Sequence, residues 1–165
     1  MRTIAVILHN LRSTHNVGSI LRTSDGVGVH QVYYTGYTPY PSEPADTRLP
    51  HIQRKITAQL HKTALGAETN VRSGHHQDIM TLLTELRHDG YQIAALEQNE
   101  SSVALPKYVP PDKLALIVGR EVEGIESEVL AAVDVTVEIP MIGQKESYNV
   151  SVAAAMALYH CRFVA

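Results

Sequence analysis

The feature that most constrains the fold of this chain is a series of short apolar runs, several of them rich in Val, Ile and Leu without polar alternation. Runs of this kind are typical of strands that are buried on both faces of a parallel sheet. The pattern predicts strands at Thr3–Leu8, Gln31–Tyr34, Tyr91–Leu96, Leu114–Gly119 and Thr136–Ile139. Helical patterns occur at Val17–Gly26, Gln53–Ala64, Asp78–Asp89, Glu126–Ala132 and Val150–Phe163. We expect helix C-caps at Gly26, Gly66 and Gly90. This alternation predicts an α/β fold, with a mainly parallel sheet flanked by helices.

Length and composition indicate one domain, residues 1–165, with a sizeable core. No run of 18 apolar residues is present, so no membrane-spanning helix is expected. The single cysteine, Cys161, fits a reducing compartment and a cytoplasmic location. The net charge of −3 argues against tight nucleic-acid binding by charge alone, but it leaves room for a local basic patch.

Two Gly-rich loops in the last third of the chain follow apolar runs. The first, Gly119-Arg-Glu121-Val-Glu-Gly124, ends the run that begins at Leu114. The second lies between Ile139 and Asn149 and leads into the last helix. A glycine turn after a buried strand lets backbone approach a ligand, and a Ser-x-Asn-x-Ser run at a helix start offers N–H groups and hydroxyls to an anion. The two loops therefore predict a binding site.

A third polar stretch, Asn16-Val-Gly18-Ser-Ile-Leu-Arg22-Thr-Ser-Asp25, lies in the first predicted helix. Helical spacing places Gly18 and Arg22 on one face, with Asp25 one turn later. One interpretation is an amphipathic helix with a surface Arg–Asp pair that stabilises little. The other is an arginine held at a cleft, where it would grip a phosphate through two hydrogen bonds.

Several familiar chemistries find no support in the sequence. The Gly26-Val-Gly28 pair follows a helix rather than a strand, and the Gly119–Gly124 loop lacks the Lys-Ser/Thr ending of a P-loop. The nine histidines are scattered, with His75-His76 expected in a loop, and one cysteine cannot supply a zinc cluster. No G-x-S-x-G elbow is present either, so we expect neither a metal site nor a hydrolase triad.

Basic residues cluster modestly in the middle of the chain, at Arg48, Arg54, Lys55, His61, Lys62 and Arg72. They fit either a solvated helix face or a patch that meets a phosphate backbone. Just before most of them lies a Pro-rich segment, Tyr37–Pro50, of a length that is usually functional or mobile inside a compact domain.

Taken together, the three polar stretches resemble the motifs of the SpoU (TrmH-like) family of RNA ribose 2'-O-methyltransferases, in the SPOUT superfamily. The first family motif, Asn-x-Gly-x-x-x-Arg, matches Asn16, Gly18 and Arg22. The second, Gly-x-Glu-x-x-Gly, matches Gly119, Glu121 and Gly124. The third, Ile-Pro-Met-x-Gly-x-x-x-Ser-x-Asn-x-Ser-x-Ala, matches Ile139 through Ala153, and the resemblance covers nearly the whole chain.

The resemblance implies a C-terminal deep trefoil knot, approximately residues 114–165, that binds S-adenosylmethionine without a metal, and a homodimer. The donor-binding positions it implies are Leu96, Gly119, Ile139, Met141, Ser147, Tyr148 and Asn149. Tyr148 departs from the Leu or Met of many relatives but keeps apolar surface.

The implied reaction is methyl transfer to a ribose 2'-hydroxyl of tRNA or rRNA, with tRNA favoured. The resemblance gives catalytic roles to Arg22, Asn16 and Glu121. A guanidinium stays protonated, so Arg22 is expected to hold the RNA phosphate and stabilise the developing alkoxide rather than act as the base. The proton acceptor is left open between the phosphate, Glu121 and water. Arg48, Arg54, Lys55 and Lys62 are expected to contact RNA.

Two alternatives remain. A catalytically silent RNA-binding relative would be favoured by loss of a catalytic residue, yet Arg22, Asn16 and Glu121 are all present. A nucleotide- or NAD-dependent α/β enzyme should show a strand–GxGxxG–helix unit, and the sequence has none.

Overall fold

The fold is built on one seven-stranded sheet in which all strand pairs are parallel, as seen in a computed structural model that describes residues 1–44 and 46–164. The strands are β1 (Thr3–His9), β2 (Gln31–Thr35), β3 (Ser73–His76), β4 (Gln92–Leu96), β5 (Val103–Ala104), β6 (Lys113–Val118) and β7 (Val135–Glu138). They lie in the order β3-β2-β1-β6-β4-β7-β5. The mainly parallel α/β fold predicted from the apolar runs is confirmed.

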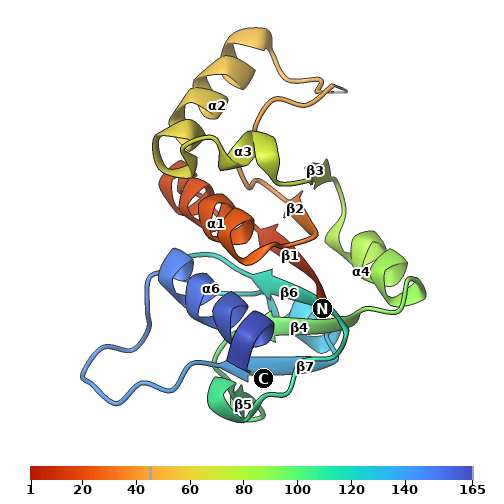
Figure 1. Ribbon diagram of the computed structural model, residues 1–165, viewed down its shortest axis with the longest axis vertical. Helices are drawn as coiled ribbons and strands as arrows, with labels where there is room; N and C mark the ends of the chain where they lie inside the picture. Colours follow the sequence, from red (N-terminus) through yellow and green to blue (C-terminus); the bar gives the residue numbers. More distant parts are fainter. Residues whose placement is uncertain (45, 165) are drawn as a thin grey trace.

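Helices cover both faces of this sheet (Figure 1). They are α1 (Thr14–Val27), α2 (Pro50–Ala64), α3 (Ala67–Asn70), α4 (Ile79–His88), α5 (Ser127–Ala131) and α6 (Val150–Tyr159), and a π-helical turn, His160–Val164, follows α6. Side chains from α1, α2, α3 and α6 share one apolar core, and those of α4 and α5 share another. Within the described ranges, no helix is long and apolar enough to cross a membrane.

Strand β1 explains why the predicted strands show no polar alternation. Ile4, Val6 and Leu8 lie in the core shared with α1 and α6, while Ala5 and Ile7 lie in the core shared with α4. Because successive side chains of a strand point to opposite faces, both faces must be apolar when both are covered. Each of these residues is fully buried.

The sequence analysis missed β3, α3, β5 and a 3-10 turn at Leu105–Lys107. His75 and His76, expected in a loop, lie in the edge strand β3, which pairs with β2. Its sequence Ser-Gly-His-His has no apolar pattern, so backbone pairing alone defines it. The four-residue α3 and the two-residue β5 are likewise too short to leave a periodic signal.

None of the three glycines predicted as helix caps is the residue that caps its helix. Helix α1 passes through Gly26, and Gly28, at φ 67°, forms its left-handed cap. Leu65, at φ 53°, caps α2, and Gly66 follows it at the start of α3. Asp89 caps α4, and Gly90 follows it at φ 84°, in the left-handed region that favours glycine.

Gly18 fixes how closely α1 packs on α2. A Cβ at this position would lie 2.1 Å from Thr63 Oγ1 and 2.5 Å from the Leu60 carbonyl oxygen. The second contact involves backbone, so the two helices would have to move apart to admit a methyl group.

We therefore expect Gly18→Ala to lower the free energy of unfolding by about 1–3 kcal/mol through overpacking. Gly26→Ala is the matched control, because Gly26 lies in the same helix with nothing within 4 Å of its would-be Cβ. It should raise the free energy of unfolding by up to about 1 kcal/mol through helix propensity. Thermal melts of both variants decide the matter, and two equal melting temperatures would contradict the close-contact account.

Candidate functional site

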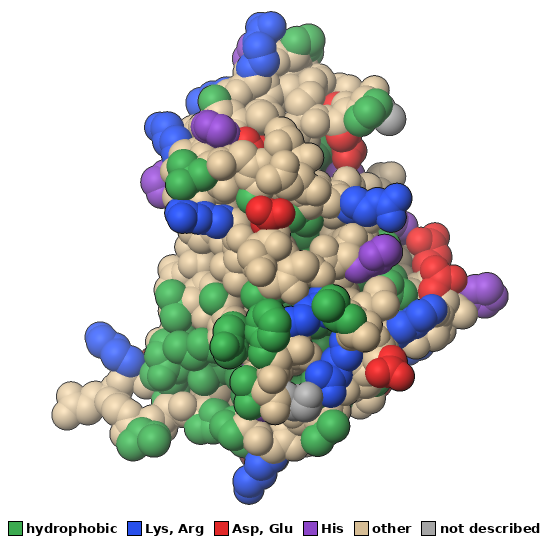
Figure 2. Space-filling view, viewed as in Figure 1, with side chains coloured by type: hydrophobic (Ala, Val, Ile, Leu, Met, Phe, Trp, Pro, Cys, Tyr) green, Lys and Arg blue, Asp and Glu red, His purple; other side chains and the backbone are tan. Residues whose placement is uncertain are grey.

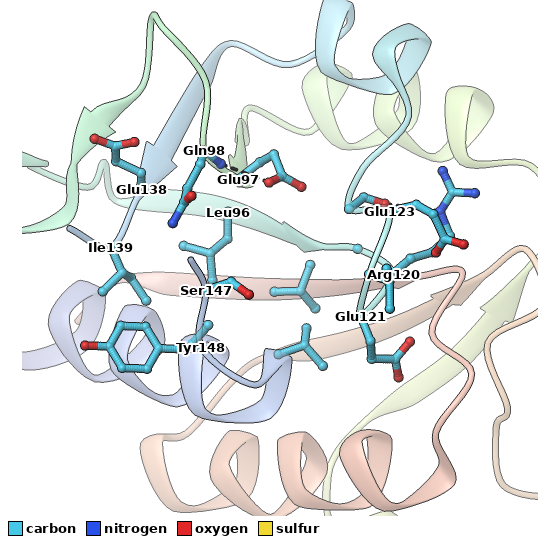
Figure 3. A pocket seen from close by; sticks show the side chains of 16 residues that line it. Leu96, Glu97, Gln98, Arg120, Glu121, Glu123, Glu138, Ile139, Ser147 and Tyr148 are labelled. Carbon is cyan, nitrogen blue, oxygen red and sulfur yellow. Dashed lines mark hydrogen bonds between the residues drawn. The ribbon is translucent and has the colours of Figure 1, made fainter. Parts of the chain in front are cut away.

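A cavity opens at the carboxyl edge of the sheet, where β4, β6 and β7 end (Figure 3). Because these strands are parallel, the loops that follow them meet at one edge. The cavity is lined by residues 96–98, 118–124, 138–139, 147–148, 150 and 153. The two Gly-rich loops of the sequence analysis therefore come together as its walls.

The first Gly-rich loop turns so tightly that only glycine fits at two of its positions. A Cβ on Gly119 would lie 2.5 Å from Ile125 Cγ1 and 2.9 Å from the carbonyl carbon of Gly124. Gly124 has φ 69°, and its Cβ would lie 2.2 Å from Glu97 Oε2. That carboxylate oxygen instead accepts a hydrogen bond from the Ile125 N–H at 3.0 Å. Glu97, directly after β4, thus fixes the loop that follows β6.

The three sequence motifs are joined by the side-chain amide of Asn16. Its Nδ2 donates to Glu121 Oε1 at 3.1 Å, across 105 residues of chain. Its Oδ1 accepts from Asn149 Nδ2 at 3.2 Å, across 133 residues. Asn149 is itself the N-cap of α6 and accepts from the Ser151 N–H at 2.9 Å. We call these two linked hydrogen bonds, from Asn16 to Glu121 and from Asn149 to Asn16, the Asn16 bridge.

Glu121 is held in its ionised form by this arrangement. Its carboxylate points toward α1 (Figure 3) and accepts from the backbone N–H groups of Arg12 and Ser13 as well as from Asn16. Partial burial opposes the charge, but these hydrogen bonds outweigh burial and lower the pKa of Glu121. A carboxylate stabilised in this way is a poor proton acceptor and a good structural anchor.

The cavity is lined by apolar and charged side chains together. Leu96, Ile139 and Tyr148 lie toward one end in Figure 3, with Glu138 beside Ile139, and Arg120, Glu121 and Glu123 lie toward the other. Four carboxylates line the cavity, from Glu97, Glu121, Glu123 and Glu138, against the single cation of Arg120. The lining suits a ligand that carries both a flat apolar group and positive charge. Across the described residues, no group of three His, Cys, Asp or Glu is placed to hold a metal ion.

Five of the seven positions expected to bind the donor line this cavity, namely Leu96, Gly119, Ile139, Ser147 and Tyr148. Met141 and Asn149 are not part of its lining, although Asn149 enters the Asn16 bridge. Arg22 is exposed on α1 and does not line the cavity. The structure therefore brings Asn16 and Glu121 together and leaves Arg22 at the surface.

The basic residues expected to contact RNA fall into two groups. Arg54, Lys55 and Lys62 are exposed on α2, where basic side chains gather (Figure 2). Arg48 instead lies within the Pro-rich segment Tyr37–Pro50 and binds other residues of that segment. It forms an ion pair with Asp46, donates to the carbonyls of Tyr40 and Pro41, and lies 3.5 Å above the Tyr40 ring.

Sequence reasoning missed a buried polar cluster beside the cavity. His9 Nδ1 lies 2.7 Å from Thr35 Oγ1, and His9 Nε2 lies 3.1 Å from Glu126 Oε2. Glu126 Oε1 accepts from Asn10 Nδ2 at 2.8 Å and lies 3.4 Å from Arg120 NH2. Burial lowers the pKa of His9, although Glu126 opposes this shift. The signal available in the sequence was the position of His9-Asn10 directly after a buried strand.

Comparison with known proteins places the whole chain in one family. The model of the SpoU rRNA Methylase family matches residues 3–159. The tRNA (guanosine(18)-2'-O)-methyltransferase of Escherichia coli (strain K12) is 30% identical over 159 residues, which cover 96% of this chain and 62% of that protein. The chain thus spans about three fifths of that relative's length.

Solved structures agree with this assignment. The A. aeolicus TrmH/SpoU tRNA modifying enzyme superposes with a TM-score of 0.79 at 26% identity, over 98% of this chain and 75% of that one. The AdoMet-bound rRNA methyltransferase from Sinorhizobium meliloti gives 0.81 at 20% identity, over 97% and 56%, and shares the fold. The chain belongs to the SpoU rRNA methylase family.

Proposed function

We propose that this protein transfers a methyl group from S-adenosylmethionine to a ribose 2'-hydroxyl of RNA, with tRNA as the favoured substrate. The observation that carries the proposal is the Asn16 bridge, which joins the three family motifs at the cavity. The names of the tRNA-modifying relatives support the reaction and the substrate. The alternative, a catalytically silent RNA-binding protein, has against it that Arg22, Asn16 and Glu121 are all retained.

The residues of the cavity fit S-adenosylmethionine, which supplies a methyl group on a positively charged sulfonium. Leu96, Ile139 and Tyr148 would cover the adenine, and Gly119 and Ser147 would offer close backbone and a hydroxyl. The surplus of carboxylates would favour the sulfonium and the amino group. Met141 would act from outside the cavity lining, and Asn149 would hold the start of α6.

Glu121 and Asn16 would position the reaction rather than exchange protons. The hydrogen bonds that lower the pKa of Glu121 occupy both carboxylate oxygens. The RNA phosphate and water then remain as acceptors for the hydroxyl proton. Arg22, exposed on α1, would hold that phosphate and stabilise the developing alkoxide.

The exposed cations of α2 would bind the RNA backbone beside the site. Arg54, Lys55 and Lys62 project from one helix that packs on α1, the helix of Asn16 and Arg22. Arg48 would contribute through the Pro-rich segment it holds, next to α2. Changing the three α2 cations to Gln should weaken tRNA binding, and unchanged binding would refute their role.

An apolar stripe on α6 and the π-turn supports a homodimer. Val152, Met156, Tyr159 and Phe163 follow helical spacing and are between 38% and 59% exposed. Hydrophobic side chains gather over α6 in Figure 2. Covering such a stripe with a second copy removes apolar surface from water. Sedimentation at twice the 18.2 kDa chain mass is the expected result, and monomers would contradict it.

The family resemblance also leads us to propose a trefoil knot within residues 114–165. Its support is the chain path: β7 lies between β4 and β5, and α6 then returns to pack on α1. Pulling on both ends should leave a shorter extended chain than 165 unknotted residues would give.

The buried free thiol of Cys161 fits a reducing compartment, and we propose the cytoplasm, which cell fractionation tests.

Donor binding can be tested through thermal stability. S-adenosylmethionine at about 100 times its Kd should stabilise the fold by about 2.7 kcal/mol, a rise of roughly 5–11 °C in melting temperature. Tyr148→Ala should reduce this rise because the apolar cover is lost. Val109→Ala, an exposed apolar change outside the cavity, serves as the control. An equal rise with NAD, or none with S-adenosylmethionine, would refute donor binding.

Methyl transfer itself can be tested with labelled donor. Labelled methyl should appear on the 2'-hydroxyl of one nucleotide in total tRNA or, separately, in rRNA. Arg22→Ala should lower the rate at least about 100-fold, as loss of a transition-state donor does. Arg22→Lys should recover only part of the lost rate, because Lys cannot form a bidentate contact with phosphate. Asp25→Ala, one turn along the same helix, is the control. Donor binding without transfer to either pool would favour the silent relative.

A further inference from the structure

Two side chains project into solvent beside the Asn16 bridge, from the loops after β1 and β2. Arg12 precedes α1, and its side chain is 70% exposed. Tyr37 follows β2 and is 51% exposed. The guanidinium carbon of Arg12 lies 5.9 Å from the centre of the Tyr37 ring. We call this pair the Arg12–Tyr37 platform.

The backbone under Tyr37 is fixed although its ring is free. Asn10 adopts φ 56°, which is unusual for a residue other than glycine, and its Oδ1 accepts from the Tyr37 N–H at 3.1 Å. Gly36, at φ 62°, leaves the space that this oxygen fills, since a Cβ there would lie 1.8 Å from it. On the other side, the Thr38 hydroxyl donates to the Leu8 carbonyl at 2.8 Å and accepts from the Leu11 N–H. A backbone held by these hydrogen bonds presents an exposed aromatic ring in a fixed place, as a recognition surface requires.

Arg12 is tied to the catalytic motifs through its backbone. Its N–H and that of Ser13 both donate to the Glu121 carboxylate, which also accepts from Asn16. The platform therefore adjoins the group that we assign to positioning the reaction. In the described chain, Glu123 at 3.8 Å is the one acid that forms an ion pair with the guanidinium, and both partners of that pair are exposed, so it holds Arg12 weakly.

A second Arg–Tyr pair in the same protein shows what a purely structural contact looks like. Arg48 lies 3.5 Å above the Tyr40 ring, pairs with Asp46 and donates to two carbonyls. The Arg48 side chain is only 18% exposed, so the ring, the carboxylate and the two carbonyls occupy most of its surface. In the Arg12–Tyr37 platform the two groups lie farther apart, at 5.9 Å, and both side chains are more than half exposed, which leaves surface for a further flat group.

We propose that the Arg12–Tyr37 platform stacks on a base of the RNA at the nucleotide to be methylated. Bases that are splayed out of RNA stack on aromatic rings and on guanidinium planes. A bare phosphate has no flat face to stack, so it would need the charge of Arg12 but not the ring of Tyr37. The inference rests on the proposed function and names the group that recognises its substrate.

A fluorescence experiment tests stacking without activity. The chain has no tryptophan, so Tyr37→Trp introduces a single indole. Unfractionated tRNA should quench its emission, because a stacked base does so, whereas inorganic polyphosphate at equal phosphate concentration should not. Binding of tRNA without quenching, or equal quenching by polyphosphate, would overturn the proposal.

Kinetics on the tRNA pool provide the second test. Tyr37→Leu should lower kcat/KM about 10- to 100-fold through a higher KM for RNA, with the KM for S-adenosylmethionine within about twofold. Tyr37→Phe keeps the ring and should lose less than about threefold. Arg12→Lys keeps the charge but not the plane, so it should behave like Arg12→Gln if stacking is the role. Full recovery in Arg12→Lys, or equal losses in the Leu and Phe variants, would show that stacking is not what these side chains do.

The two proposals can fail separately. If the wild-type protein methylates RNA and Tyr37→Leu does so equally well, only the platform is refuted. If the wild-type protein methylates no RNA, the proposed function fails, and the quenching experiment still decides whether Tyr37 meets a base.

Discussion

The candidate site depends on one side-chain amide, that of Asn16. It donates to Glu121 and accepts from Asn149, and so connects the start of α1, the loop after β6 and the start of α6. A carboxylate in place of this amide could not donate to Glu121, and an aliphatic side chain could do neither. The three motifs, far apart in the sequence, thus meet at one point in space, where the donors and acceptors of Asn16, Glu121 and Asn149 match.

The parallel sheet makes that meeting possible. Strands β1, β4, β6 and β7 all end at the same edge, so loops that are distant in sequence become neighbours there. The core on each face holds the strands in register, and the loops inherit their positions from it. Glu97 adds a further tie at this edge, because it accepts from the Ile125 N–H and thereby orders the turn at Gly124.

The sequence predicted five of the seven strands, five of the six α-helices and the loops that form the cavity, because each carries an apolar, periodic or glycine signal. It did not predict β3, whose Ser-Gly-His-His sequence has no apolar face, or the caps of α1 and α2. Leu65 takes a left-handed conformation that favours glycine although Gly66 is adjacent, which no local rule anticipates. The roles of Glu97, His9 and Arg48 depend on partners 28, 117 and 2 residues away, and only the last of these lies within reach of local reasoning.

The fit between Glu97 and Gly124 also has a consequence for how such a protein can evolve. The Glu97 carboxylate occupies the space in which any side chain at position 124 would have to begin. The effect of a mutation at position 124 therefore depends on the residue at position 97, and the reverse also holds. The two positions are epistatic because their side chains compete for the same volume. The positive φ of Gly124 adds a second barrier that shortening Glu97 would not remove. A side chain at position 124 therefore has to displace the Glu97 carboxylate from the Ile125 N–H, and the positive φ keeps glycine favoured even after that displacement.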